Sequence, residues 1–276
     1  MPARKSAGIF VRVVVSPCFL HPPSPLNVTT PAPPRTPAPE RADYGIDAPT
    51  VIRNLLLGAL LSAAVAVVAS TGVVHAPALR ATAIVMVAVC LAEVGLMTWS
   101  SRAGKLRLRD RLLDGLALRG DERVLDVGCG RGLLLIGAAR RLPEGRAAGI
   151  DLWQARDLSG NAMERTLANA RAEGVAERVE VHTGDMRTMP FADASFDAAV
   201  SNLAIHNLRG AAERAAAVAE VARVVKPGGR VLIVDIAGTA VYADALRRLG
   251  WTEVRRSGFS FLIFPPVRIV TGRKPG

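Results

Sequence analysis

The stretch Val124-Leu125-Asp126-Val127-Gly128-Cys129-Gly130-Arg131-Gly132 places an apolar run directly before three glycines at alternate positions. A short apolar run is typical of a buried strand, and glycines directly after it allow a sharp turn in which the backbone comes close to a ligand. The dinucleotide-binding fingerprint needs its third glycine one position later, where this chain has Leu133. The spacing therefore favours a GxGxG turn over the GxGxxG turn of nicotinamide-dependent enzymes.

Runs with strand character alternate with helical runs around this turn. The expected strands are Glu122–Val127, Arg146–Ile150, Arg178–His182, Phe196–Ser201 and Arg230–Ile236, and the expected helices are 131–142, 160–173, 210–224 and 240–249. Two further strand-like runs, Thr252–Gly258 and Val267–Thr271, follow without a helix between them and predict a closing antiparallel hairpin. Alternating strands and helices predict a parallel sheet with helices on both faces. We therefore expect an α/β, Rossmann-like, doubly wound seven-stranded sheet with its last strand antiparallel.

Acidic residues end the second and third expected strands. The chain reads Gly149-Ile150-Asp151 at the second, Thr183-Gly184-Asp185-Met186 at the third, and Arg223-Val224-Val225-Lys226-Pro227-Gly228-Gly229-Arg230 before the fifth. Together with the glycine turn, these motifs in this order resemble the class I S-adenosylmethionine-dependent methyltransferases. The resemblance extends from Lys105 to the C-terminus, and it implies a methyltransferase domain over residues 121–276 with S-adenosyl-L-methionine as its cofactor.

The resemblance also implies which residues bind this cofactor. Asp126 helps to place the methionine end, Asp151 accepts the ribose hydroxyls, and Asp185 faces the adenine amino group with Met186 against the ring. The other predicted cofactor contacts are Gly128, Cys129, Gly130, Gly132, Leu152 and Asn202. Two alternatives stay open: Asp126 as a cap of the following helix, and the other two acids as solvated turn residues.

Residues directly after the fourth expected strand are the candidates for catalysis. Methyl transfer from a sulfonium is an in-line displacement, and a base is needed only when the acceptor must lose a proton. The family lines its transfer pocket at the position of Asn202–Asn207. His206 is the candidate base, because histidine is the side chain that titrates near neutral pH, and Asn207 is the candidate to orient His206 or a substrate carbonyl. A packing role for His206 is the alternative.

Two long apolar runs precede the glycine turn. Leu55–Val74 contains no charged residue, and Ala81–Trp99 contains only Glu93. A helix needs about 20 apolar residues to cross a bilayer core, so residues 51–100 predict a two-helix transmembrane hairpin, with buried core helices or a membrane-associated hairpin as alternatives. Residues 101–111 carry five basic side chains, more than the connecting loop does. We therefore expect the protein at a membrane, with its catalytic domain on the cytoplasmic side.

The segments on either side of the predicted hairpin differ in character. Residues 101–120 predict a basic amphipathic lead-in helix with its leucines on one side. These leucines are Leu108, Leu112, Leu113 and Leu116. The basic side fits anionic headgroups or water equally well. Residues 1–50 carry most of the 18 prolines and lack apolar periodicity, which predicts a disordered Pro-rich segment.

The composition argues against nucleic-acid and metal partners. Half of the residues are apolar, aromatic residues make up only 4%, and the net charge is +11. The basic residues are not concentrated on the predicted α/β domain, so we expect no nucleic-acid partner. Cys18, Cys90 and Cys129 are widely spaced and have no histidine at ligand spacing, so we expect no metal. The favoured interpretation is methyl transfer to a small or lipophilic acceptor, and a cofactor-binding sensor or scaffold is the alternative.

Overall fold

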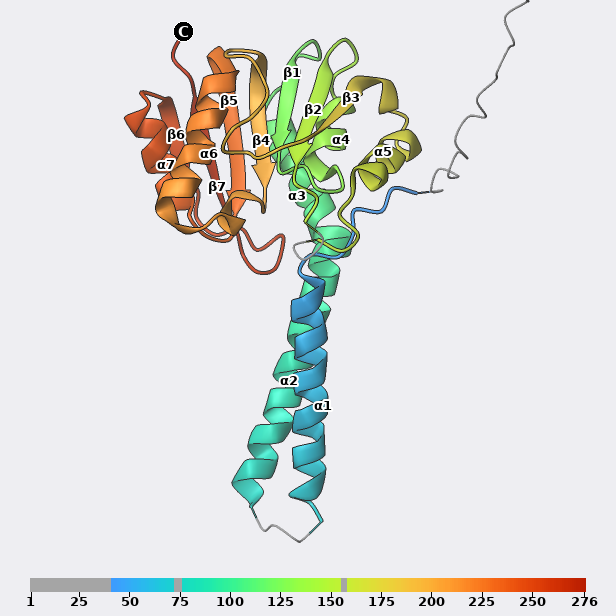
Figure 1. Ribbon diagram of the computed structural model, residues 1–276. Coiled ribbons are helices and arrows are strands. Elements are labelled where there is room, and N and C mark those ends of the chain that lie inside the picture. Colours follow the sequence, from blue (N-terminus) through green and yellow to red (C-terminus); the bar gives the residue numbers. More distant parts are fainter. Residues whose placement is uncertain (1–40, 72–75, 155–157) are drawn as a thin grey trace, which may run out of the picture. The chain divides into compact units, whose positions relative to one another are not determined.

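A computed structural model describes residues 41–71, 76–154 and 158–276 of the chain (Figure 1). The helices are α1 (Pro49–Val68), α2 (Pro77–Trp99), the π-helical turn η1 (Ser100–Gly104), α3 (Lys105–Gly115), α4 (Leu133–Ala139), α5 (Met163–Ala172), the short η2 (Ala176–Arg178) and η3 (Ile205–Asn207), α6 (Gly210–Val224) and α7 (Thr239–Arg248). The strands are β1 (Arg123–Val127), β2 (Arg146–Asp151), β3 (Val179–Thr183), β4 (Phe196–Asn202), β5 (Val225–Asp235), β6 (Thr252–Arg256) and β7 (Arg268–Arg273).

The strands form one seven-stranded sheet in the order β3-β2-β1-β4-β5-β7-β6. The first five strands pair in parallel, and β7 runs antiparallel to both of its neighbours, β5 and β6. The predicted fold class is therefore confirmed. β5 begins at Val225 and not at Arg230, because Gly228 and Gly229, which resemble a turn in the sequence, exchange backbone hydrogen bonds with Lys274 beyond β7.

Helices cover both faces of the sheet (Figure 1). On one face, α3, α4 and α5 pack in a cluster that includes the buried side chains of Leu113 and Leu135. On the other face, α6 and α7 pack in a cluster around Val218 and Tyr242. Neighbouring strand residues alternate between the two clusters, as strand geometry requires. The carboxyl ends of the parallel strands consequently meet at one edge, which is where open α/β sheets bind ligands.

The helices α1 and α2 pack against each other through small side chains. Ala59 of α1 and Ala83 and Cys90 of α2 are buried, and an added Cβ at Gly58 would lie 3.7 Å from the Cys90 sulfur. Large apolar side chains point outward instead, and Leu60 is 69% exposed. Both helices are long and apolar enough to cross a membrane.

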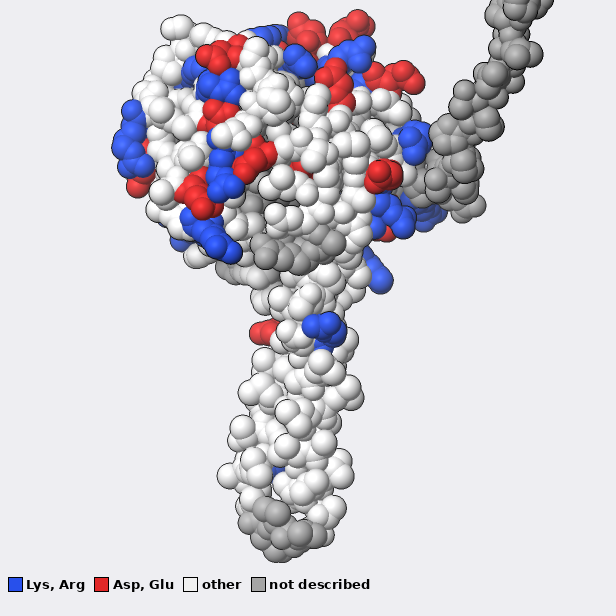
Figure 2. Space-filling view, in the orientation of Figure 1, with Lys and Arg blue, Asp and Glu red and all other residues white. Residues whose placement is uncertain are grey.

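The outer surface of these two helices is nearly free of charge (Figure 2). α1 contains only Arg53 as a charged residue, and α2 contains only Arg80 and Glu93. α1 begins at Pro49 and ends at Val68, so it begins and ends about six residues before the uncharged run Leu55–Val74 of the sequence analysis. Residues 72–75 of that run lie outside the described residues.

Residues 41–48, which we call the N-terminal strap, correct the prediction that the disordered segment extends to residue 50. The backbone N–H of Asp43 donates to Asn169 Oδ1 at 2.9 Å, and that of Ile46 donates to Ser159 Oγ at 2.9 Å. The strap contains no proline, so its backbone N–H groups can donate hydrogen bonds to the α/β domain. The rest of the Pro-rich segment, residues 1–40, lies outside the described residues.

Lys105, at the start of α3, holds the strap against the α/β domain. Its Nζ donates to the carbonyl oxygens of Tyr44 at 2.9 Å and Gly45 at 2.7 Å, and it lies 3.2 Å from the Asp47 carboxylate. Burial lowers the pKa of the Lys105 amine, although the charge of Asp47 opposes the change. The basic side of α3 is thus only partly exposed, because Lys105 and Arg109 are both buried.

Candidate functional site

The glycine turn joins β1 to α4 at the carboxyl edge of the sheet. Gly128, Gly130 and Gly132 have φ values of +73°, +51° and +86°, a region that favours glycine. A Cβ at Gly128 would lie 2.2 Å from the Cβ of Ala204, in the turn after β4. Only glycine fits at residue 128, and its absence of a side chain lets the two turns touch.

Asp126 is buried beneath the turn. Its Oδ2 accepts the backbone N–H of Leu135 at 2.8 Å, so it caps α4, as one of the alternatives for this residue stated. Burial raises the pKa of Asp126 to about 7, and the charge of Asp151 adds to the rise while the Leu135 hydrogen bond opposes it. Burial and these two carboxylates also raise the pKa of the Cys129 thiol, which therefore stays protonated and packs as a small side chain.

Asp151, at the end of β2, connects the glycine turn to the loop that follows β2. Its Oδ2 accepts the backbone N–H of Gly130 at 2.8 Å, and its Oδ1 accepts the N–H groups of Trp153 at 2.6 Å and Asn161 Nδ2 at 3.2 Å. A carboxylate offers about four acceptor positions, so capacity remains for a ligand. Asn161 Oδ1 is buried without a partner among the described residues. The sequence analysis did not select Asn161, since a single amide in a polar loop carries no pattern.

His206 lies in the η3 turn after β4, beside the end of β5. Its Nδ1 is 2.6 Å from Oδ1 of Asp235, which is fully buried. The two groups are in contact, but the geometry is not that of an aligned hydrogen bond.

Asp235 also holds the backbone around His206. It accepts the backbone N–H of His206 at 3.0 Å and the hydroxyl of Tyr242 at 3.0 Å. Burial and the charge of Asp235 raise the pKa of Tyr242, which keeps this hydroxyl protonated as a donor. The residue placed to orient His206 is therefore Asp235, whereas Asn207 was the sequence candidate. The sequence signal that could have identified Asp235 is its position as an acidic residue at the end of β5.

One cavity of about 630 Å³ brings most of the predicted site residues together. Those that line it are Asp126, Gly128, Cys129, Gly130, Asp151, Leu152, Met186, Asn202, His206 and Asn207. Two predicted residues are not among its lining. Gly132 faces Ile136 and Thr166, and the Asp185 carboxylate is bound by the Arg187 side chain at 2.6 Å, which holds the pKa of Asp185 below its usual value.

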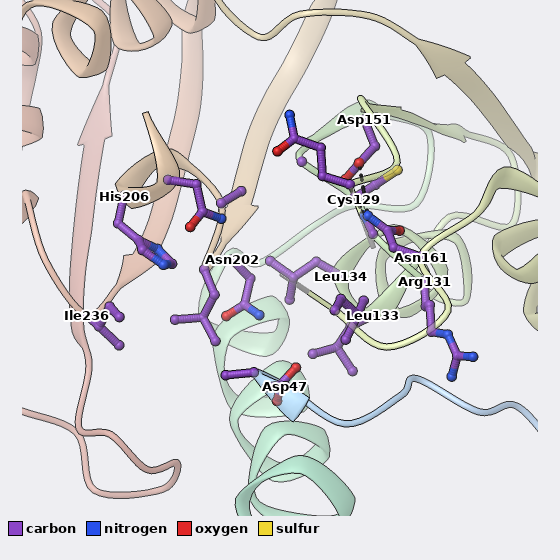
Figure 3. Close-up of a pocket in the computed structure, with 18 of the residues that line it drawn as sticks. Asp47, Cys129, Arg131, Leu133, Leu134, Asp151, Asn161, Asn202, His206 and Ile236 are labelled. Carbon is purple, nitrogen blue, oxygen red and sulfur yellow. Dashed lines mark hydrogen bonds between the residues drawn. The ribbon is translucent and has the colours of Figure 1, made fainter. Parts of the chain in front are cut away.

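The remaining wall of the cavity comes from outside the glycine-turn region. It includes Asp47 of the strap, Met97 and Ser100 at the end of α2, which we call the foot of the hairpin, and Ile263 and Phe264 of the β6–β7 loop. Residues after β3 and before α6, such as Arg187 and Arg209, line it as well. Figure 3 shows Asp151 and Cys129 on one side of the cavity, the His206 ring and Ile236 on the other, and Asp47 toward the α1 end. The cavity therefore has a region beside the glycine turn, a region beside His206, and a wall built by the hairpin foot.

Comparison with known proteins identifies the central part of the chain. Residues 124–229 match the family described as "Methyltransferase domain". The chain is 33% identical over 127 residues to a ubiquinone/menaquinone biosynthesis C-methyltransferase of Dinoroseobacter shibae, a match that covers 46% of this chain and 47% of that protein. It is 32% identical over 150 residues to 27-O-demethylrifamycin SV methyltransferase of Amycolatopsis mediterranei, covering 52% of each chain. The chain thus spans about half the length of these curated relatives.

A solved structure supports the fold. The model resembles an S-adenosylmethionine-dependent methyltransferase from Aquifex aeolicus with a TM-score of 0.50 and 18% sequence identity. This likeness covers 65% of this chain and 96% of that one.

Proposed function

We propose that the protein, whose residues 124–229 match the methyltransferase-domain family, transfers a methyl group from S-adenosyl-L-methionine to a lipophilic acceptor at the cytoplasmic face of a membrane. The observation that carries this proposal is the single cavity that joins the glycine turn and Asp151 to His206 and has the hairpin foot as its wall. Each part of the cavity supports one part of the proposed reaction.

The region beside the glycine turn fits an adenosyl sulfonium. The remaining acceptor position of Asp151 suits a ribose hydroxyl, and the carbonyl oxygen of Asn161, buried without a partner among the described residues, is a further acceptor. Asp126 and Asp151 give this region negative charge, which favours a cationic ligand. Met186 lines the same region and offers an apolar surface to the adenine ring. Asp185 is occupied by Arg187, so we assign it no direct role.

The pKa of Asp126 predicts a pH dependence of cofactor binding. In the free protein this carboxyl is protonated below a pH of about 7 and charged above it. A cation binds the charged form better, so affinity for S-adenosylmethionine should rise with pH through this range, by about tenfold per pH unit at most. Calorimetric titration at several pH values measures this slope.

The matched variant for this titration is Asp126→Asn, whose amide oxygen still accepts the Leu135 N–H. The affinity of this variant should depend less on pH than that of the wild type, because residue 126 no longer titrates. Any pH dependence that comes from the amine of the ligand remains in both proteins. Identical slopes in the two proteins would contradict the assignment of Asp126.

The region beside His206 is suited to remove a proton from the acceptor. When bound, S-adenosylmethionine supplies a methyl group already activated on a sulfonium, so the protein needs only to align the acceptor, exclude water and accept a proton where one is lost. Nδ1 of His206 faces Asp235, which leaves Nε2 as the nitrogen available to an acceptor hydroxyl. The buried Asp235 stabilises the imidazolium that results. This arrangement favours an acceptor with an acidic hydroxyl, such as a phenol.

Two observations support a lipophilic acceptor. Met97, Ile263 and Phe264 form an apolar part of the cavity wall where the hairpin joins the domain, so a molecule dissolved in lipid has a short path to His206. The names of the two relatives describe methylation in quinone biosynthesis and of a rifamycin. A quinone precursor is therefore one acceptor class that we propose.

The two apolar helices support the membrane location. Their outer surfaces carry large apolar side chains, and they have the length and hydropathy of membrane spans. Exposed arginines follow α2 at residues 102, 107 and 111, and by the positive-inside rule they support a cytoplasmic location of the α/β domain.

Methyl transfer to lipid-soluble material tests the proposal. The full chain in nanodiscs, given a subsaturating concentration of S-adenosylmethionine with a labelled methyl group and a lipid extract of cells that carry the gene, should put label into the chloroform phase, and Asp151→Ala should put in much less. Label found only in the aqueous phase would exclude a lipophilic acceptor. Binding of S-adenosylhomocysteine in calorimetry without any transfer would favour the sensor, and absence of binding would overturn the enzyme assignment.

A further inference from the structure

The loop between β6 and β7 exposes two phenylalanines. Phe259 is 55% and Phe261 is 74% exposed, more than any other large apolar side chain outside α1 and α2 among the described residues. Two exposed aromatic side chains, separated by one residue in the same loop, are unfavourable in water. We call residues 257–267 the aromatic loop.

The aromatic loop is held in a defined conformation. Ser260 and Val267 exchange backbone hydrogen bonds of 2.7 and 3.1 Å across it, and Ile263 is buried at its far end. These contacts fix the loop, so the phenylalanines are exposed because the loop presents them outward.

The same loop is attached to the foot of the hairpin. The backbone N–H of Phe264 donates to Ser100 Oγ at 2.9 Å. The carbonyl oxygen of Leu262 lies so close to Gly104 that a Cβ there would be 2.2 Å from it. The aromatic loop therefore lies where α2 leaves the α/β domain, next to the segment that we propose to span the membrane (Figure 1).

The surroundings of the phenylalanines are basic. The Arg268 guanidinium lies over the Phe259 ring, 4.0 Å from its centroid, and Arg111 of α3 lines the groove that also contains Phe259 and Phe261. No acidic residue lines this groove among the described residues. Aromatic rings with arginines beside a membrane span are typical of the headgroup region, where rings enter the apolar boundary and guanidinium groups bind phosphates.

We infer that the aromatic loop is a second membrane contact, which inserts Phe261 and Phe259 into the lipid surface around the hairpin and places Arg111 and Arg268 at lipid phosphates. This inference rests on the proposed membrane location of the hairpin. Ile263, Phe264 and Pro265 follow two residues after Phe261 and line the cavity. Insertion of the loop therefore holds this part of the cavity wall against the bilayer, on the path that a lipophilic acceptor would take.

Spin labels on the full chain test the inference. Phe261→Cys and Phe259→Cys are each labelled with a nitroxide in a Cys18→Ser background, since Cys90 and Cys129 are buried. The protein is placed in nanodiscs of phosphatidylcholine and phosphatidylglycerol. We compare how often the label collides with oxygen, which concentrates in lipid, and how often it collides with a water-soluble nickel chelate. Both loop labels should collide preferentially with oxygen.

Two control positions make every outcome decisive. Leu249 is 48% exposed and precedes the start of β6, whereas the aromatic loop follows the end of this strand, so the label of Leu249→Cys should favour nickel. Leu60→Cys in α1 should favour oxygen if the hairpin is in the bilayer. Loop labels that behave like Leu249→Cys while Leu60→Cys favours oxygen would overturn the second contact and leave the hairpin in place. Nickel preference at Leu60→Cys would overturn both.

Discussion

Replacing His206 with alanine should lower the turnover of methyl transfer by about 10²–10⁴-fold, the usual contribution of a positioned general base. The affinity for S-adenosylhomocysteine should stay nearly unchanged, because His206 lies on the opposite side of the cavity from Asp151 (Figure 3). Single-turnover rates with a hydroxyl acceptor, together with calorimetry, measure the two effects separately. Full activity of His206→Ala would reassign the residue to packing.

Asp235→Asn is the informative partner of this variant. It keeps an oxygen for the Tyr242 hydroxyl and the His206 backbone N–H but removes the charge that lies 2.6 Å from His206 Nδ1. If Asp235 positions and stabilises the base, the variant should slow turnover and shift the pH profile of the rate, with KM for the acceptor little changed. A purely structural role would lower the melting temperature and leave the pH profile of the remaining activity as it was.

Replacing Asp151 with alanine should weaken cofactor binding by about 1 to 3 kcal/mol, the cost of leaving charged hydrogen bonds unmade. This corresponds to roughly fivefold to 150-fold in Kd. The loss has two sources, since Asp151 also accepts the N–H groups of Gly130, Trp153 and Asn161 and so shapes the turn itself.

Asp151→Asn separates these two sources. The amide retains an acceptor oxygen for the turn but lacks the charge, so it should bind S-adenosylhomocysteine with intermediate affinity and melt close to wild type. Unchanged affinity in Asp151→Ala would show that the ribose does not lie at this carboxylate.

The parts of the fold that follow from local pattern could be predicted from the sequence. Alternation of strands and helices gave the parallel sheet, and the absence of a helix after Thr252 indicated the antiparallel end that β7 forms. The glycine turn could also be predicted, because the positive φ values at Gly128, Gly130 and Gly132 favour glycine at these positions. Residues that meet at the carboxyl ends of neighbouring strands, such as Asp126 and Asp151, follow from the same topology.

The individual side-chain contacts could not be predicted. The topology makes β4 and β5 neighbours, but no spacing rule selects Asp235 and His206 as the pair that meets. Asp185 was assigned from the family resemblance, whereas Arg187, two residues later, binds its carboxylate in the local turn. The hairpin foot became part of the cavity wall through side-chain packing that composition does not encode.

The hold of Lys105 on the strap has a practical consequence for handling the protein. A shortened version that begins at α3, made to avoid detergent, would leave the Lys105 amine without the carbonyl oxygens of Tyr44 and Gly45, and Arg131 without Asp43. Both cations are buried in the full chain. The same cut would open the acceptor side of the cavity to water by removing Asp47, Met97 and Ser100. We therefore expect such a fragment to be less stable than the full chain and to bind S-adenosylhomocysteine more weakly.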